Sequence, residues 1–178
     1  GFCRTNLFKR LESSGFSFLI SLSRHILRNY LFFYAVQNNL PVPIGKNISQ
    51  SLDDFLEDSD IDNNGEHESI INFLLDENKY LENAARVYDL CSCDKFKHQF
   101  DWIRSEFFAP ALLKQLATDS TNIINILRIG KDWNVAEDRK LNALHKLLSE
   151  KHKSEKVLIF TQFADTAYYL AEHLKNRN

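Results

Sequence analysis

Apolar residues recur every three or four positions over long stretches of this chain of 178 residues. The pattern is clearest between Leu7 and Tyr34, and this spacing is that of one face of an α-helix. Only five Gly and three Pro punctuate the chain, which is few for a turn-rich β fold. The chain is therefore expected to be mainly α.

Turn-forming residues divide this pattern into separate helices. "SSG" at 13–15 predicts a break or kink, and "NNLPVPIGKN" at 38–47 predicts a stop. The acidic stretch 47–68 predicts a short helix followed by a loop. Further helices are expected over 68–90, over 91–109 and from Pro110 to Gly130. In the helix over 91–109, four apolar side chains are expected to face inward: Phe96, Phe100, Ile103 and Phe107.

The last forty residues predict a helix, a strand and a second helix. Leucines stripe the first helix, and the apolar run Val157–Phe160 is typical of a strand covered on both faces in a parallel sheet. Asp165 or Thr166 is expected to cap the final helix. The residues expected to be buried on that helix are Ala167, Tyr168, Leu170, Ala171 and Leu174.

This β–loop–α unit predicts a parallel α/β domain. We expect a helical region over 1–135, with its acidic loop at about 47–68, followed over 136–178 by the first α-β-α unit of a truncated domain. The strand would lack sheet partners. It is expected to be poorly covered, to borrow contacts from the helices, or to self-associate through its edge.

Charge and composition limit the surroundings of the chain. Residues 1–38 hold five Lys and Arg against one acid, whereas residues 39–90 hold three against twelve. The longest apolar run is too short to span a bilayer, and the first residues show no leader pattern. Three Cys suggest reduced thiols. We expect a cytoplasmic protein without membrane contact.

Two motifs resemble those of bacterial Swi/Snf-like ATPases of helicase superfamily two. Asp138, Lys140 and Leu141 match a "D-x-K-L" helix, and 156–163 match the strand and "T-Q-F" turn known as helicase motif IV. Residues 9–14 resemble a "K-R-x-E-S-S" helix from the region between the two motor domains. The matches cover about a third of the chain.

The resemblance implies a RecA-like fold for 136–178, the start of the second (helicase C-terminal) domain. It also implies a parent protein that is a DNA-dependent ATPase or helicase, with DNA and the remaining motor domains as partners. Motif IV contacts the nucleic-acid backbone in this family, which makes Thr161, Gln162 and Phe163 the first candidate contacts. The position of Thr161 and Gln162 beyond a strand end also suits phosphate binding, although a plain strand end is the alternative.

Four basic residues are the second set of candidate nucleic-acid contacts: Lys9, Arg10, Arg24 and Arg28. Arg24 and Arg28 are four apart and share a helix face, so they are suited to phosphate contact. An ordinary solvated face, or pairing with the acidic middle segment, explains the same pattern. Glu12 is a further candidate to pair with a nearby Arg and lock the helix junction.

The motifs for ATP hydrolysis are missing from the sequence. There is no G-x-x-x-x-G-K-[ST] loop and no acidic run to hold magnesium, so no catalytic residue is assigned. ATP and magnesium are implied for the parent protein alone. The rival interpretations are a non-enzymatic helical interaction module and a small phosphate-binding enzyme.

Two metal-like patterns are weak. Residues 60–71 begin like a calcium-binding loop, but position twelve is Ile71 where a bidentate Glu is needed. Cys91, Cys93 and His98 have the wrong spacing and lack a fourth ligand for zinc. No metal site is predicted.

Overall fold

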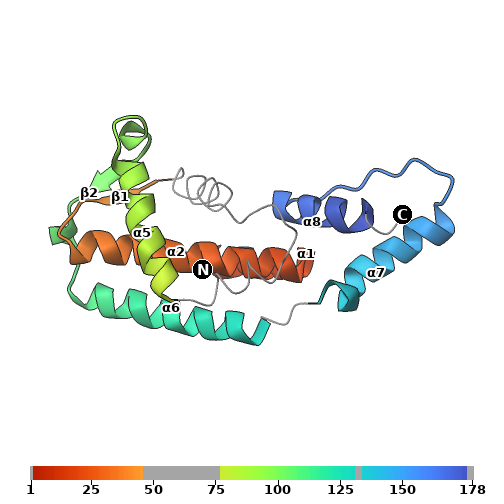
Figure 1. Ribbon diagram of the computed structural model, residues 1–178, viewed down its shortest axis with the longest axis horizontal. Helices are drawn as coiled ribbons and strands as arrows, with labels where there is room; N and C mark the ends of the chain where they lie inside the picture. Colours follow the sequence, from red (N-terminus) through yellow and green to blue (C-terminus); the bar gives the residue numbers. More distant parts are fainter. Residues whose placement is uncertain (1, 46–76, 131–133, 176–178) are drawn as a thin grey trace. The chain divides into compact units, whose positions relative to one another are not determined.

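The computed structural model describes residues 2–45, 77–130 and 134–175 (Figure 1). This part of the chain is mainly helical, as predicted. The helices are α1 (Phe2–Ser13), α2 (Gly15–Gln37), α5 (Glu77–Ser92), α6 (Ala111–Gly130), α7 (Arg139–Lys146) and α8 (Ala164–Lys175). The strands are β1 (Val42–Ile44) and β2 (Asp101–Ile103), and shorter helical turns are η1 (Lys97–Gln99), η2 (Ser105–Phe107), η3 (Val135–Glu137) and η4 (Leu147–Lys151).

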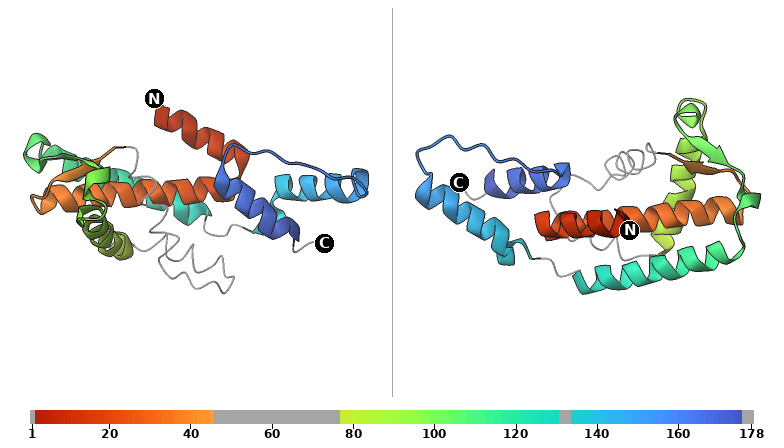
Figure 2. Two further views of the ribbon diagram at one scale, coloured as in Figure 1. Left: turned by 90° about the horizontal axis from the view of Figure 1, so that it is seen from above. Right: turned by 180° about the vertical axis from the view of Figure 1, so that it is seen from behind.

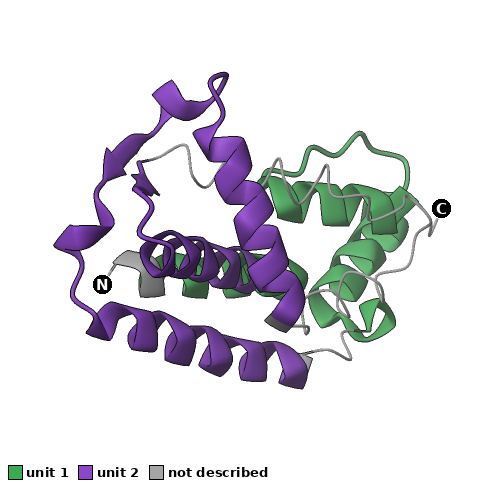
Figure 3. Ribbon diagram, turned by 60° about the vertical axis from the view of Figure 1, so that its left-hand side comes forward, with its two compact units in different colours: residues 1–21, 132–178 green, residues 22–131 purple. Residues whose placement is uncertain are grey.

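The chain divides into two compact units (Figure 3). The first unit combines residues 1–21 with 132–178, and the second holds residues 22–131. The long helix α2 begins in the first unit and ends in the second. The predicted boundary at about residue 135 lies near the start of the segment 132–178. Residues 1–21, which include α1, belong to the same unit as this segment.

The predicted break at "SSG" lies at Ser14, between α1 and α2 (Figure 2). The Ser14 amide donates to the Arg10 carbonyl at 2.9 Å, and the Ser14 carbonyl accepts from the Phe18 amide at 3.0 Å. The Ser14 hydroxyl also accepts from the Ser17 amide at 3.4 Å, in the manner of a helix N-cap. The chain changes direction here while these backbone groups keep their partners.

The predicted stop after α2 is also confirmed, and Asn39 makes it possible. Asn39 has a φ of 54°, the left-handed conformation that ends many helices. The Leu40 amide donates to the Ala35 carbonyl at 2.8 Å and the Asn39 amide to the Val36 carbonyl at 3.2 Å. These two bonds make a Schellman motif, which turns the chain into β1.

The core of the second unit is built on α2. Figure 1 shows α5 crossing α2 and α6 running alongside it. Tyr30 stacks on Tyr80 with ring centroids 6.1 Å apart, and Tyr34 lies 5.7 Å from Tyr88. Aliphatic side chains that are almost fully buried in this unit are Ile26, Leu27, Leu31, Val87 and Ile124. Tyr30, Tyr80 and Tyr88 are buried in this core, whereas Tyr34 is half-buried.

The helix predicted over 91–109 is wrong beyond Cys93. This stretch forms η1, β2 and η2 instead, and β2 pairs antiparallel with β1 in the register Val42 to Ile103. Phe100 is buried, as expected, but Phe107 is 69% exposed. Pairing with a distant strand overrides the local helical spacing, which sequence alone does not reveal. The helix predicted from Pro110 to Gly130 is confirmed as α6.

The predicted strand at 156–163 does not form, although all of its residues are described. The side chains of Leu158 and Phe160 are 83% and 89% exposed. A strand needs a neighbour to hydrogen-bond to, and no part of the described chain pairs with this one. The expectation that it would be poorly covered is confirmed.

The final helix is confirmed, but its buried face is not the predicted one. It begins at Ala164, so Asp165 and Thr166 lie in its first turn rather than at its cap. The buried residues are Thr166 and Tyr169, three apart. Tyr168 is 73% exposed, and Ala167 and Ala171 are exposed too. Polar contacts with α1 and α2 select the inward face here.

Two further expectations concern membrane contact and the acidic middle segment. No helix among the described residues is long and apolar enough to cross a membrane. The acidic stretch 47–68 and the calcium-like loop at 60–71 lie outside the described residues.

A buried and an exposed isoleucine on α6 test the core of the second unit. Ile124 is 1% exposed and Ile129 is 84% exposed. We expect Ile124→Ala to lower the free energy of unfolding by about 2–5 kcal/mol, since it leaves a cavity. Ile129→Ala should change it by less than about 0.5–1 kcal/mol. Urea unfolding measures both, and equal losses would contradict this core.

His25 predicts a pH dependence of the second unit. Burial lowers its pKa below the ordinary 6.5, and the charge of Arg28 lowers it further, while Asp119 opposes the shift. The unfolded chain therefore takes up this proton more readily, and the free energy of unfolding should fall as pH drops below 6.5.

Urea titrations between about pH 8 and about pH 5 measure this slope. His25→Gln should flatten it, whereas His98→Gln, at an exposed position in the same unit, should leave it unchanged. A His25→Gln variant with the slope of the unaltered chain would contradict the assignment.

Candidate nucleic-acid interface

The "T-Q-F" turn is held by its own side chain. The Thr161 hydroxyl accepts a hydrogen bond from the Phe163 amide at 3.3 Å, and the Phe163 carbonyl accepts from the Ala167 amide at 3.2 Å. The first bond closes a local hydroxyl turn, and the second belongs to the start of α8. Thr161 and Phe163 are half-buried, whereas Gln162 is exposed.

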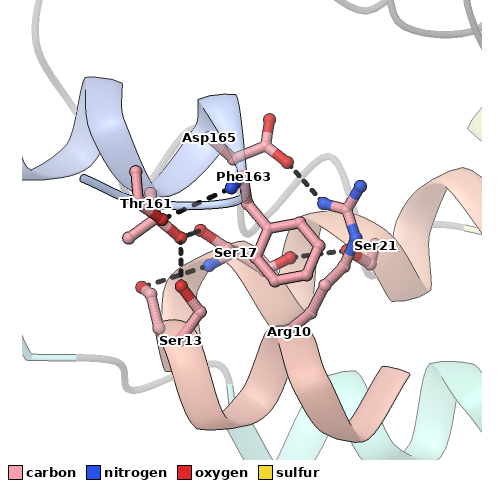
Figure 4. A network of polar contacts seen from close by, with 9 residues as sticks. Arg10, Ser13, Ser17, Ser21, Thr161, Phe163 and Asp165 are labelled. Atoms are coloured by element: carbon pink, nitrogen blue, oxygen red, sulfur yellow. Dashed lines mark hydrogen bonds and ion pairs between the residues drawn. The ribbon is translucent and has the colours of Figure 1, made fainter. Parts of the chain in front are cut away.

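Arg10 of α1 lies against this turn (Figure 4). Its Nη1 is 2.6 Å from Oδ2 of Asp165, and its guanidinium lies 4.8 Å from the ring centroid of Phe163. The side chains of Arg10 and Asp165 are 28% and 20% exposed. Such a partly desolvated ion pair, with the cation also over an aromatic face, is stronger than a pair in open solvent.

Hydroxyl groups surround Thr166 in the same place. Its Oγ1 lies 2.9 Å from the Ser13 hydroxyl and 3.0 Å from the Ser17 hydroxyl. Thr166 is 4% exposed and Ser17 is fully buried. We call the set Arg10, Ser13, Ser17, Phe163, Asp165 and Thr166 the α1–α8 junction.

The "D-x-K-L" residues contribute three different contacts to the same unit. Oδ1 of Asp138 accepts from the amides of Lys140 and Leu141 at 2.9 and 3.0 Å, which caps α7. Oδ2 of Asp138 accepts from the Tyr169 hydroxyl at 2.9 Å. The Lys140 ammonium donates to the Glu12 carbonyl, and Leu141 is 1% exposed.

Tyr169 extends this contact chain to α2. Its ring stacks on Phe16 with centroids 5.3 Å apart, and His173 meets it edge-on at 4.6 Å. The carboxylate of Asp138 is therefore linked through Tyr169 to the start of α2. Glu12 joins the unit through its backbone carbonyl, while the residue itself is exposed.

The three stretches that carry the family resemblance thus meet within one compact unit. These stretches are residues 9–14, 138–141 and 156–163, and they lie far apart in the sequence. Lys140 contacts Glu12 and Arg10 contacts Phe163, while Arg10 and Ser13 also bond to Asp165 and Thr166, just beyond the third stretch. Of the candidate site residues, the unit brings together Arg10, Thr161 and Phe163, with Lys9 and Gln162 exposed beside them in sequence.

The structure places Arg24 and Arg28 in the second unit. Both are half-buried, and their Nε atoms are buried. Arg28 lies close enough to His25 to lower its pKa. Their spacing of four predicted an open, basic helix face that includes both arginines. This face is less accessible than expected, because both side chains are half-buried.

The three residues of the cysteine cluster differ in burial. Cys91 is buried, Cys93 is half-buried and His98 is exposed. No group of three or more His, Cys, Asp or Glu that suits a metal occurs among the described residues. Burial, with a smaller effect of Cys93, raises the pKa of Cys91 to about 11, so its thiol stays protonated.

The sequence interpretation missed the partners that build the junction. Asp165 and Thr166 were expected to act as a helix cap, and Ser17 and Tyr169 were not singled out. A signal was present, because Ser17 and Ser21 are four apart and so share one face of α2. The Ser21 hydroxyl donates to the Ser17 carbonyl at 2.7 Å, which continues this polar stripe.

Comparisons with known proteins add no relative. No protein-family model, no curated protein and no solved structure matches the chain.

A double-mutant cycle tests the hydroxyl cluster. Ser17→Ala and Thr166→Val each remove one side of a buried hydrogen bond, so their effects should not add. We expect a coupling of about 0.5–1.5 kcal/mol in the free energy of unfolding. The matched cycle pairs Thr166→Val with Ser149→Ala on η4, where Ser149 is exposed, and should be additive. Additivity in both cycles would contradict the contact.

Proposed function

We propose that this chain is part of an ATP-dependent DNA translocase or helicase of the Swi/Snf-like type. In this proposal residues 1–135 supply the helical region between two motor domains, and 136–178 begin the second RecA-like domain. The observation that carries it is the junction itself. Residues 9–14, which resemble one family motif, contact Lys140 of the second motif and Phe163 of the third, and they also bond to Asp165 and Thr166 just beyond it.

The exposed segment Val157–Phe160 supports the same proposal. Four consecutive apolar side chains are between 43% and 89% exposed, and Tyr168 on α8 is 73% exposed. A contiguous apolar surface of this kind normally meets another surface. Neighbouring strands of a parallel sheet would cover both faces of the segment and satisfy its backbone groups.

The proposed role is mechanical and positional rather than chemical. Coupling nucleotide binding to DNA movement requires a rigid connection between a motor domain and the helices that adjoin it. The α1–α8 junction provides such a connection, through an ion pair and two hydroxyl bonds. ATP and magnesium would be bound by other parts of the parent protein.

Contact with the nucleic-acid backbone is proposed at the exposed side chains near the junction. Lys9 is exposed on α1 and Gln162 is exposed in the turn. An ammonium group suits a phosphate, and an amide suits a phosphate or sugar oxygen. Arg24 and Arg28 remain second-rank candidates because of their buried Nε atoms.

A non-enzymatic interaction module is the second candidate function. The exposed apolar segment favours it equally, since such a surface also suits a protein partner. The two candidates differ in nucleic-acid binding: the motor proposal requires it, and the module does not.

Fluorescence anisotropy with a labelled DNA duplex, at several salt concentrations, separates the two. We expect weak binding whose logarithm falls linearly with the logarithm of salt concentration, because counterions are released. Lys9→Ala should reduce the magnitude of that slope by about 1, the loss of one phosphate contact. Lys114→Ala, at an exposed position on α6, should leave it unchanged.

Two results would contradict these expectations. Absence of salt-dependent binding would contradict the motor proposal and favour the interaction module. Equal effects of Lys9→Ala and Lys114→Ala would remove the site assignment, because they would indicate attraction by net charge alone.

A further inference from the structure

We infer that Arg10 is a positioning residue that fixes the Thr161–Phe163 turn, and that Gln162 is the side chain this turn presents to a nucleic-acid backbone. The inference rests on the proposed function and revises it, because the sequence pattern had assigned Arg10 itself to a phosphate. Four observations within the first unit carry it.

The guanidinium of Arg10 already makes two contacts within the unit. Its Nη1 meets the Asp165 carboxylate at 2.6 Å, and its Cζ lies 4.8 Å from the centroid of the Phe163 ring. The pair is only 28% and 20% exposed. A phosphate contact would need this ion pair to open, which is costly in a partly buried place.

Both residues that Arg10 contacts lie at the end of the turn. Phe163 closes the turn through its amide, which donates to Thr161, and opens α8 through its carbonyl, which accepts from Ala167. Asp165 lies in the first turn of α8. Holding these two side chains therefore holds the backbone on the C-terminal side of Gln162.

A separate set of contacts holds α8 in place. Thr166 bonds to Ser13 and Ser17, and Tyr169 bonds to Asp138 and stacks on Phe16. None of these contacts involves Arg10. Loss of the Arg10 side chain should thus loosen the turn while α8 stays attached, which makes the positioning role separable from folding.

Lys9 provides a matched comparison next to Arg10 in the sequence. It carries the same charge, lies on the same helix and is exposed, whereas Arg10 is half-buried. Lys9, as a direct phosphate contact, and Arg10, as a positioning residue, are thus adjacent in the sequence. The two roles predict different results in a salt series of DNA binding. Removing a phosphate contact lowers the salt slope, whereas removing a positioning residue lowers affinity at an unchanged slope.

The test uses the full chain and two readouts. Hydrogen–deuterium exchange of the peptide that covers 157–166 reports the turn without any DNA. Duplex binding over a salt series reports affinity and slope. The variants are Arg10→Ala, Arg10→Lys, Lys9→Ala and Gln162→Ala, with circular dichroism to confirm that each is folded.

We expect Arg10→Ala to speed exchange in 157–166 and to weaken binding by about tenfold at constant slope, since about one molecule in ten would keep the competent turn. Arg10→Lys should restore part of both effects, because it keeps the charge opposite Asp165 but lacks the planar group over Phe163. Gln162→Ala should weaken binding without faster exchange, and Lys9→Ala should lower the slope by about 1 with unchanged exchange.

Three results would overturn the inference. Unchanged exchange in Arg10→Ala would show that the turn does not depend on this side chain. A slope lowered by about 1 in Arg10→Ala would identify a direct phosphate contact. Unchanged affinity in Gln162→Ala would exclude its contact. If the unaltered chain binds no duplex, the proposed function fails, while the exchange measurement still decides whether Arg10 positions the turn.

Discussion

The contact between Arg10 and Asp165 joins two residues that are 155 positions apart in the chain. The rest of the first unit depends on closing this long loop, because its N-terminal helix and its C-terminal segment have no local reason to meet. Closing a loop of this length costs conformational entropy that polar contacts alone rarely offset. The apolar contacts of Leu141, Phe16 and Tyr169 supply the accompanying burial.

The polar character of the junction has a physical consequence. Thr166 and Ser17 are almost fully buried, and a buried hydroxyl without a partner is destabilising. Their mutual bonds are therefore satisfied in one relative placement of α8 and α2, and a shift by one residue would leave them unpaired. Such a network contributes specificity of placement more than stability.

Sequence reasoning predicted the elements that depend on local signals. The kink at Ser14, the stop at Asn39, the start of α6 after Pro110 and the helix α7 all follow from residues within or close to the feature. Elements that depend on distant partners were predicted less well. The residues of β2 were expected to be helical because no residue near them in the sequence indicates pairing with β1. The strand at 156–163 was expected from its apolar run, but a strand there needs neighbouring strands that the described chain lacks.

The candidate site divides in the same way. The sequence assigned Arg10 and the turn residues Thr161 and Phe163 to two separate sets of nucleic-acid contacts, whereas the structure brings them together in contact with one another. Spacing alone could not distinguish an arginine that faces a phosphate from one that faces Asp165, because both roles need the same side chain at the same helical position. The face of α8 was misplaced for a related reason. Its apolar residues were assumed to face inward, whereas Thr166 and Tyr169 do so through polar bonds.

The central claim is that the N-terminal helices and the C-terminal segment form one unit around Thr166. Nuclear Overhauser effects in the isotope-labelled chain measure this directly. We predict cross-peaks between the Thr166 methyl group and the β-protons of Ser17, and between the rings of Phe16 and Tyr169, whose centroids are 5.3 Å apart. Absence of both sets of cross-peaks in a folded sample would contradict the account, because the start of α2 and α8 would then not meet as described.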